Sequence, residues 1–343
     1  MATIKDVAKS ASVSIATVSR VLNHAVNISP ELEERVRKAI SELGYMPNNA
    51  ARCLVKQRTN AIGVVVNNLH DMYFNELIEG FEMGATSTNY NVVFCSTYGH
   101  DSKMREKYVS YLCSGVVDGI VLYGSYRSDE NMIRHLVENK HPFLLVESEF
   151  RDIPTNSLLI DNLSDARKAV DFLYQKNHQA IAYISGDPNK MDLIDRLTGY
   201  MQRMAEIGLP IHPGFIQHTS SDYSDGYNRM QELLHLNGQR PSAVLCATDA
   251  IASYAIRAAL DEGMRVPEDI SVMGFGNQKL LPGHYQGPSI TTVEKPLSQM
   301  GKESIDILTE ILKGNLKEGL PIRKVYETYV VEKESTTFRR EIE

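Results

Sequence analysis

From Ile62 onward the sequence alternates short apolar, β-branched runs with longer helical stretches. Runs that are apolar at every position are typical of parallel strands buried on both faces by crossover helices. Their spacing of very roughly 30 residues predicts about nine strands, which suit two α/β lobes of doubly wound parallel sheet better than one sheet. Ligands of such sheets bind at the carboxyl ends of the strands, here in the expected cleft between the lobes. The runs lie at 62–66, 92–95, 119–123, 143–146, 158–160, 180–184, 243–246 and 270–273.

The first 46 residues carry a different pattern. Apolar residues recur at helical spacing in three stretches, 4–11, 18–22 and 32–43. Ser14 is well placed to cap the second helix, and Pro30 suits the first position of the third. Two short helices joined by a tight turn, with a third helix closing the core, predict a helix-turn-helix head.

Charge is distributed unevenly along the chain. The net charge of the whole chain is −7, yet residues 1–60 hold nine Lys and Arg against five acids, a balance of +4, which leaves −11 for the remainder. A small basic head on a large acidic body is the asymmetry expected when only one end of a protein binds nucleic acid.

Composition excludes several other classes. The four cysteines are widely spaced without a CxxC, and the ten histidines show no HExxH, so neither a disulfide framework, a metal site nor a cofactor is expected. No apolar run reaches the roughly 18 residues of a membrane span. The N-terminus lacks the pattern of a secretory signal. These features predict a protein of the reducing cytoplasm.

Seven blocks of sequence together resemble the LacI/GalR family of bacterial transcription repressors. The resemblance extends over nearly the whole chain, and the blocks follow the order and spacing of the family. Three lie in the head and four in the body: TIKDVA (3–8), VSIATVSRVLN (13–23), LGYMPN (43–48), VDGI (117–120), DRLTGY (195–200), VPEDISVMGF (266–275) and ITTV (290–293).

This resemblance implies a cytoplasmic homodimer that binds a pseudo-palindromic operator, with a sugar or sugar phosphate between the lobes altering operator affinity. It also implies a body like the periplasmic sugar-binding proteins, with three crossovers between lobes. The expected parts are a helix-turn-helix head at 1–46, a hinge helix and linker at 47–60, a two-lobed body at 61–338 and a tail at 339–343. Lobe 1 is expected at about 61–161 and 293–320, and lobe 2 at about 162–292 and 321–338.

The family pattern implies that Ile15, Ala16 and Arg20, on the second helix, set sequence preference in the major groove. Arg20 suits two parallel hydrogen bonds to a guanine, worth roughly 1–3 kcal/mol of discrimination, or else is a solvated surface arginine. Ile15 and Ala16 offer only apolar contact. Short polar side chains suit phosphate contacts or, alternatively, helix capping. They are Thr3, Ser14, Thr17, Ser19 and Asn23.

Leu54 is a large apolar residue in a short, basic and polar segment. The family resemblance implies that it enters the minor groove between the half-sites, unstacks a base step and bends the duplex. Ala51, one helical turn earlier, lines the same groove. The alternative is that Leu54 packs against its own body.

Aromatic and arginine side chains are the first candidates for the effector site. Tyr73 and Phe74 open the first helix of the body, where an aromatic ring stacks on a sugar or a nucleobase, or else packs in the core. The resemblance implies that Arg196 holds sugar hydroxyls or a carboxylate, for which a guanidinium is well suited. The alternative for Arg196 is a salt bridge to Asp192 or Asp195.

Asp249 follows a predicted strand, and the family has Asn or Asp there to bond ligand hydroxyls; the alternative is a cap of the next helix. Asp161, at a strand crossover, and Ser125, at the end of the predicted strand 119–123, are further candidates. The sequence departs from the family at Gly276, where many relatives carry an Asp that clamps two hydroxyls. Either the effector differs from a plain monosaccharide, or Asn277 and Asp249 replace the clamp, or effector binding is lost.

Two other functions are alternatives to a repressor. A sugar or nucleotide enzyme is disfavoured because no GxGxxG, Walker P-loop or GxSxG motif is present. A secreted, non-enzymatic sugar-binding protein would explain the body but neither the basic head nor the missing signal. The prediction is therefore a non-enzymatic, effector-controlled DNA-binding repressor.

Overall fold

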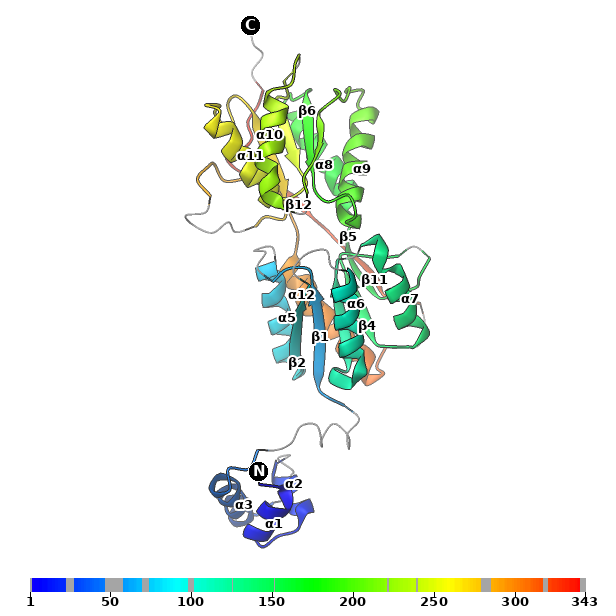
Figure 1. Cartoon of the computed structure of the whole chain (residues 1–343), viewed down its shortest axis with the longest axis vertical. Coiled ribbons are helices and arrows are strands. Elements are labelled where there is room, and N and C mark those ends of the chain that lie inside the picture. Colours follow the sequence, from blue (N-terminus) through cyan, green and yellow to red (C-terminus); the bar gives the residue numbers. More distant parts are fainter. Residues whose placement is uncertain are drawn as a thin grey trace. The chain divides into compact units, whose positions relative to one another are not determined.

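The computed structural model forms two compact units, 1–59 and 60–343, and each is described by itself (Figure 1). Among the described residues, no helix combines the length and the apolar character needed to cross a membrane. The residues that the structure describes are 2–22, 28–46, 58–69, 74–97, 102–124, 126–150, 152–220, 222–238, 240–278, 285–316 and 320–339.

The first unit contains the three helices that the sequence predicts: α1 (Ile4–Ser10), α2 (Ile15–Leu22) and α3 (Pro30–Glu42). Ser29 caps α3 by accepting a hydrogen bond from the Leu32 amide at 3.4 Å, and Pro30 occupies the first turn. A small apolar core joins the three helices, as their helical spacing predicts. Its buried members are Val7, Ala8, Ala11, Val18, Val21, Val36 and Ala39.

The second unit contains two six-stranded sheets, ordered β11-β5-β4-β3-β1-β2 and β12-β10-β9-β8-β6-β7. All pairings are parallel except the antiparallel pair β10–β12. The eight predicted runs are strands within one or two residues, which confirms the doubly wound α/β prediction. The strands are β1 (Ala61–Val66), β2 (Asn91–Ser96), β3 (Gly119–Tyr123), β4 (Phe143–Val146), β5 (Ser157–Ile160), β6 (Ile181–Ser185), β7 (Ile216–His218), β8 (Ala243–Cys246), β9 (Ser271–Phe275), β10 (Thr291–Glu294), β11 (Arg323–Tyr326) and β12 (Tyr329–Val331).

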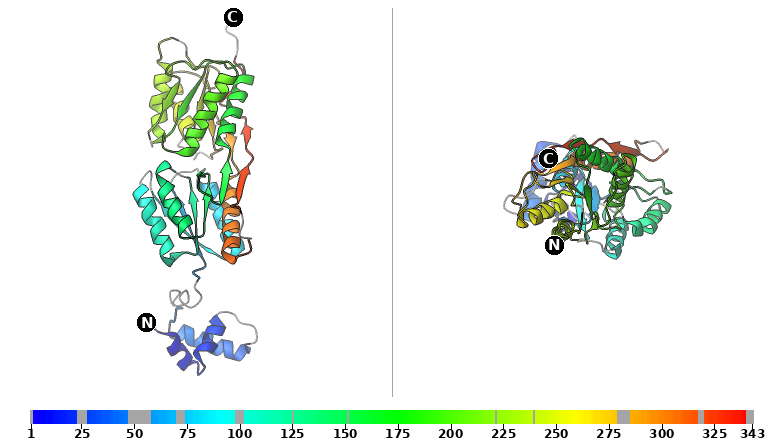
Figure 2. Two further views of the ribbon diagram at one scale, coloured as in Figure 1. Left: turned by 90° about the vertical axis from the view of Figure 1, so that its right-hand side faces the viewer. Right: turned by 90° about the horizontal axis from the view of Figure 1, so that it is seen from above.

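Helices lie on both faces of the two sheets (Figures 1 and 2). In the lobe of the first sheet, α5 and α12 share one apolar core and α6 and α7 share the other. The α5–α12 contact requires glycine, because a Cβ on Gly80 would lie 2.1 Å from the Ser298 carbonyl oxygen. The helices are α5 (Phe74–Thr88), α6 (Ser102–Tyr111), α7 (Glu130–Glu138), α8 (Asn162–Gln175), α9 (Met191–Glu206), α10 (Gly226–Leu234), α11 (Asp249–Asp261) and α12 (Leu297–Lys313).

Strand pairing corrects two of the predicted lobe boundaries. β10 pairs with β9, so Val293 and Glu294 belong to lobe 2, and the chain crosses to lobe 1 only after them. β11 pairs with β5, so 323–326 belongs to lobe 1 rather than lobe 2. The chain returns to lobe 2 between β11 and β12. The boundaries were misplaced because they depend on which distant strand each late strand joins, which local patterning does not encode.

Candidate DNA-binding face and inter-lobe polar cluster

Helix α2 has one buried and one exposed face. Val18 and Val21 are buried in the core of the unit, which fixes the rotation of the helix about its axis. Ile15, Ala16 and Arg20 are therefore exposed, with 44% of Ile15 accessible to solvent. A large aliphatic side chain and an arginine that are both exposed on one helix are suited to contact with base edges in a major groove.

The candidate phosphate-contacting residues also hold the helix ends. Thr3 forms a capping box with Asp6, and these hydrogen bonds from Thr3 lower the pKa of the Asp6 carboxyl. The Ser14 hydroxyl accepts from the Thr17 amide at 3.1 Å and pairs with the Thr17 hydroxyl at 2.9 Å. Ser19 is half-buried. Capping is thus the observed role of Thr3 and Ser14, and an exposed cap leaves both residues accessible to a phosphate.

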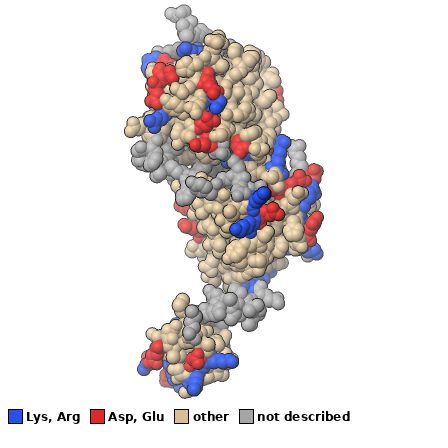
Figure 3. Space-filling view, in the orientation of Figure 1, with Lys and Arg blue, Asp and Glu red and all other residues tan. Residues whose placement is uncertain are grey.

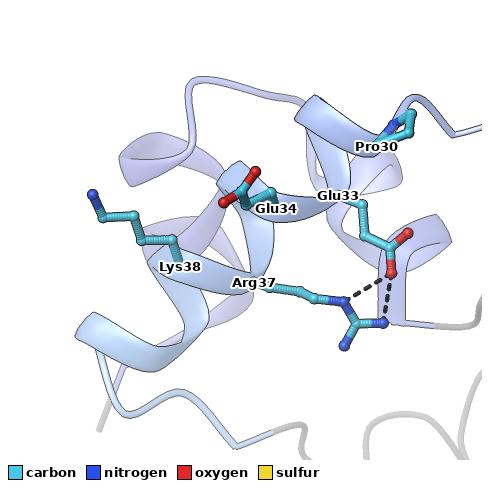
Figure 4. A pocket seen from close by; sticks show the side chains of 5 residues that line it. All are labelled: Pro30, Glu33, Glu34, Arg37 and Lys38. Carbon is cyan, nitrogen blue, oxygen red and sulfur yellow. Dashed lines mark hydrogen bonds and ion pairs between the residues drawn. The ribbon is translucent and has the colours of Figure 1, made fainter.

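Arg20 differs from Arg37 on the neighbouring helix α3. Figure 4 shows the shallow pocket along α3, where the Arg37 guanidinium binds the Glu33 carboxylate, with Nη2 and Oε1 2.6 Å apart. Among the described residues, Arg20 has no such ion-pair partner. Within the described residues, the Arg20 guanidinium is therefore open to an external acceptor, whereas that of Arg37 is already bound.

Five predicted site residues lie outside the described residues. They are Asn23, Ala51, Leu54, Tyr73 and Ser125. Their roles remain predictions.

Arg196 lies at the centre of a polar cluster in the second unit. It projects from α9 with 2% exposure, and Nε donates to Asn162 at 2.9 Å. Nη1 donates to the Ala247 carbonyl at 2.6 Å, and Nη2 pairs with Asp192 at 3.1 Å. The guanidinium also lies over the ring of Phe275, 5.1 Å from its centroid. Of the two predicted salt-bridge partners, Asp192 is the observed one, and Arg196 holds together the ends of several elements of lobe 2.

Asp249 is buried, and both carboxylate oxygens accept hydrogen bonds. The Thr292 hydroxyl donates to Oδ1 at 2.7 Å and the Gln278 amide to Oδ2 at 2.8 Å. Burial nevertheless raises the pKa of Asp249 to about 6. The cap of α11 is Thr248, which accepts from the Ile251 amide at 3.2 Å, so the alternative that Asp249 caps this helix is wrong.

At Gly276, where the sequence departs from the family's Asp, the backbone conformation itself favours glycine. Gly276 has φ of +122°, which residues with side chains rarely adopt, so an aspartate there would need a different local backbone. Asn277, one candidate replacement, accepts instead from Lys333 Nζ at 2.6 Å. Two residues earlier, a Cβ on Gly274 would lie 2.2 Å from Asp249 Oδ1. The described contacts thus commit Asn277 and Asp249 to bonds within lobe 2.

Phe74 and Asp161 have structural positions. Phe74 is buried with its ring edge-on to Tyr123, the centroids 4.8 Å apart. Asp161 is the N-cap of α8 and accepts from the Ser164 amide at 3.0 Å and its hydroxyl at 2.7 Å. These positions fit the packing alternative for Phe74 and a capping role for Asp161, and effector contact stays a prediction for both.

A buried ion pair that was not predicted from the sequence joins Glu147 and Lys295, whose Oε1 and Nζ atoms are 2.7 Å apart. The residues are 148 positions apart, and neither belongs to a motif. The only available signal was that each directly follows a strand, at the carboxyl end where ligand-binding residues gather.

Comparison with known proteins gives consistent matches. Residues 3–48 match the model of bacterial regulatory proteins, lacI family, and residues 170–336 match a periplasmic binding protein-like domain. The HTH-type transcriptional regulator RegA of Clostridium saccharobutylicum is 36% identical over 334 residues, which are 97% of this chain and 98% of RegA. The HTH-type transcriptional repressor CytR of Escherichia coli K12 is 33% identical over 317 residues, 91% of this chain and 90% of CytR.

Two solved structures extend the match to the fold. The lac repressor dimer bound to operator and the anti-inducer ONPF has a TM-score of 0.84 at 25% identity, over 98% of this chain and 99% of that one. The complex of the transcriptional regulator CelR with cellobiose has a TM-score of 0.72 at 28% identity, over 98% and 100%.

Proposed function

The chain belongs to the lacI family of bacterial regulatory proteins, and from that premise we propose that it is a homodimeric repressor that binds a pseudo-palindromic operator in the cytoplasm. Membership makes it a DNA-binding transcriptional regulator. We further propose that a small polar molecule, a sugar or sugar derivative, binds between the lobes and changes operator affinity without being turned over. The relatives' names, which describe regulators and in one case a cellobiose complex, support this proposal.

The observation that carries the proposal is the exposed face of α2. Its buried valines orient Ile15, Ala16 and Arg20 away from the core, and Arg20 has no ion-pair partner among the described residues. A helix that enters the major groove reads bases with side chains in these positions, and a guanidinium suits the two acceptors of guanine. Ile15 and Ala16 are assigned to thymine methyl groups or sugars.

The remaining DNA contacts divide into two kinds. Thr3, Ser14, Thr17, Ser19 and Asn23 are proposed to fix the register on phosphates. Leu54 is proposed as the minor-groove wedge, with Ala51 beside it.

Support for the effector site comes from the polar groups of the second unit. Asp249 lies three residues after β8, and Arg196, from within α9, donates to the Ala247 carbonyl that directly follows this strand, so both groups meet at a strand's carboxyl end, where ligands of open α/β sheets bind. Both are bonded to neighbouring groups in the described structure. We therefore propose that an effector exchanges some of these internal hydrogen bonds for its own. Tyr73, Phe74, Ser125 and Asp161 are the further proposed contacts.

The test is fluorescence anisotropy with a labelled duplex from the protein's own promoter and a scrambled duplex, over a series of salt concentrations. Wild type should prefer the promoter duplex, with affinity falling steeply as salt rises. Arg20→Ala should reduce that preference by about 1–3 kcal/mol. The matched control, Arg37→Ala, removes the same charge from α3 and should lower binding to both duplexes alike, if at all. Equal binding of both duplexes by wild type would contradict the proposal.

A further inference from the structure

The buried pair Glu147–Lys295 lies where the two lobes join. Glu147 directly follows β4 of the first sheet, and Lys295 directly follows β10 of the second, on the crossover that leads to α12. Both side chains are 2% exposed, and their charged atoms are 2.7 Å apart. The Tyr123 hydroxyl, from lobe 1, donates to the second carboxylate oxygen of Glu147. The pair thus connects lobe 1 to the crossover.

Arg196, on α9 of lobe 2, acts electrostatically on both members of the pair. Burial opposes ionisation of Glu147, but Lys295 and Arg196 together hold the pKa of its carboxyl below the ordinary value. Burial and then repulsion by Arg196 lower the pKa of Lys295. Asp192, which pairs with Arg196 at 3.1 Å, completes a set of two positive and two negative groups. The set has no net charge, and it includes residues from both lobes and the crossover between them.

We propose that Glu147 and Lys295 are a positioning pair that holds the two lobes at the angle seen in the structure, and that operator affinity depends on it. The inference rests on the proposed function, because it concerns how the lobes of this repressor are set. It deepens that function by naming residues outside both the DNA-binding face and the candidate effector contacts.

The physical argument is that a buried ion pair is neutral as a whole, whereas one partner alone is not. Removing either partner leaves a full charge without compensation in a water-poor site. If the lobes move apart, water reaches the uncompensated charge and lowers this free-energy cost. A charge that is buried within one lobe reaches water only if that lobe unfolds. Removing both partners leaves no charge to hydrate. Each single substitution should therefore change the lobe angle, and the double substitution should restore it.

The test is a double-mutant cycle with Glu147→Gln, Lys295→Gln and the two combined, in the full-length protein. Operator dissociation constants are measured by anisotropy, hydrogen–deuterium exchange is followed in peptides covering 143–150 and 291–297, and melting temperature reports folding. The control is Lys176→Gln, which breaks a pair of 2.6 Å between Lys176, 7% exposed, and Glu332. That pair joins α8 to the end of β12 within lobe 2, so this variant should lower the melting temperature only.

Both single variants should shift the operator dissociation constant in the same direction by roughly fivefold or more and speed exchange in both peptides, while the double variant returns to within about twofold of wild type. Unchanged operator affinity and exchange in both single variants, or a double variant no better than the worse single one, would overturn the inference.

If the single variants do not fold, Tyr123→Phe replaces them, since it removes one hydrogen bond from Glu147 and leaves both charges paired. It should give a smaller shift in the same direction, and no shift overturns the inference. Failure of the proposed function would instead appear as absence of specific binding by wild type.

Discussion

The two units of the chain use their polar side chains in opposite ways. In the first unit, the candidate base-contacting residues of α2, Ile15, Ala16 and Arg20, are exposed, and the buried residues of that helix are apolar. In the second, the candidate effector-contacting groups Arg196 and Asp249 are each 2% exposed and are bonded to neighbours. A DNA-binding face must be exposed because the duplex is rigid. A regulatory site can instead be closed by internal hydrogen bonds, so that an effector changes the protein's conformation when it replaces them. The same residue type, arginine, should therefore have different effects in the two units.

The comparison is tested most strongly by removing an arginine from each unit. Arg196→Met leaves Asn162, Asp192 and the Ala247 carbonyl without their donor, so the second unit should lose about 3–5 kcal/mol of unfolding free energy. Arg20→Ala removes an exposed side chain and should change unfolding free energy by less than about 0.5 kcal/mol. Urea denaturation followed by circular dichroism measures both. Similar losses of unfolding free energy in the two variants would contradict the proposed difference between the two units.

Titration gives the next largest effect, which comes from two buried groups of the second unit. Burial lowers the pKa of His178 to about 4, and its ring bonds Ser242 and the Thr337 carbonyl at 3.0 Å each. The unfolded chain then binds more protons than the folded one, so His178 makes stability fall as pH drops from 6.5 to 4, by up to about 3 kcal/mol. Asp249, with its pKa raised to about 6, acts in the opposite sense between pH 6 and 3.8.

These two groups should largely cancel in wild type and separate in variants. In Asp249→Asn the His178 effect is no longer opposed by Asp249, so urea midpoints should decrease as pH falls through this range. In His178→Gln the Asp249 effect is no longer opposed by His178, and the midpoints should increase instead between about pH 6.5 and 5, before the carboxyls of lowered pKa bind protons. Parallel pH profiles for the two variants would show that neither group titrates as its burial implies.

The sequence predicted what local patterns encode and missed what depends on long-range pairing. The head helices follow from apolar spacing over a few turns, and strands such as β3 and β4 follow from uninterrupted apolar runs. By contrast, β11 is partly exposed, with Arg323 and Val325 open to solvent, and its partner β5 lies more than 160 residues earlier. Chain patterning holds no information on such a pairing, so the lobe boundary was misplaced.

The same distinction separates the two candidate sites. Ile15, Ala16 and Arg20 occupy one helix, and their exposure follows from the buried Val18 and Val21 of that helix. The contacts of Asp249 come instead from residues 29 and 43 positions away. The chemical type of such a residue is readable in the sequence, but the groups that already occupy its hydrogen bonds are not.

A core substitution in each unit tests whether the two units are also separate in stability. Val36 is fully buried in the small core of the first unit, and Val36→Ala should cost that unit about 2 kcal/mol through lost burial and a cavity. Specific operator binding should fall while the main calorimetric transition is unchanged. Val64→Ala, at an equally buried position of β1, is the matched control and should lower the main transition. A shift of the main transition by Val36→Ala would mean that the units unfold together.

The smallest expected effect compares an N-cap in each unit. Asp161 caps α8 and Ser29 caps α3, and loss of either side chain should cost about 1 kcal/mol in its own unit.

If Asp161 only caps, Asp161→Ala lowers the stability of the second unit. A sugar that changes operator affinity in wild type should then change it equally in this variant. If Asp161 also binds the effector, that response weakens, and Asp161→Asn, which keeps a capping oxygen but not the charge, restores stability without restoring the response. Ser29→Ala should lower the stability of the first unit and with it operator binding, because its helix closes the core on which α2 rests, and should leave the stability of the second unit unchanged. An Asp161→Ala variant with unchanged stability would show that the hydrogen bonds to Ser164 contribute nothing to α8.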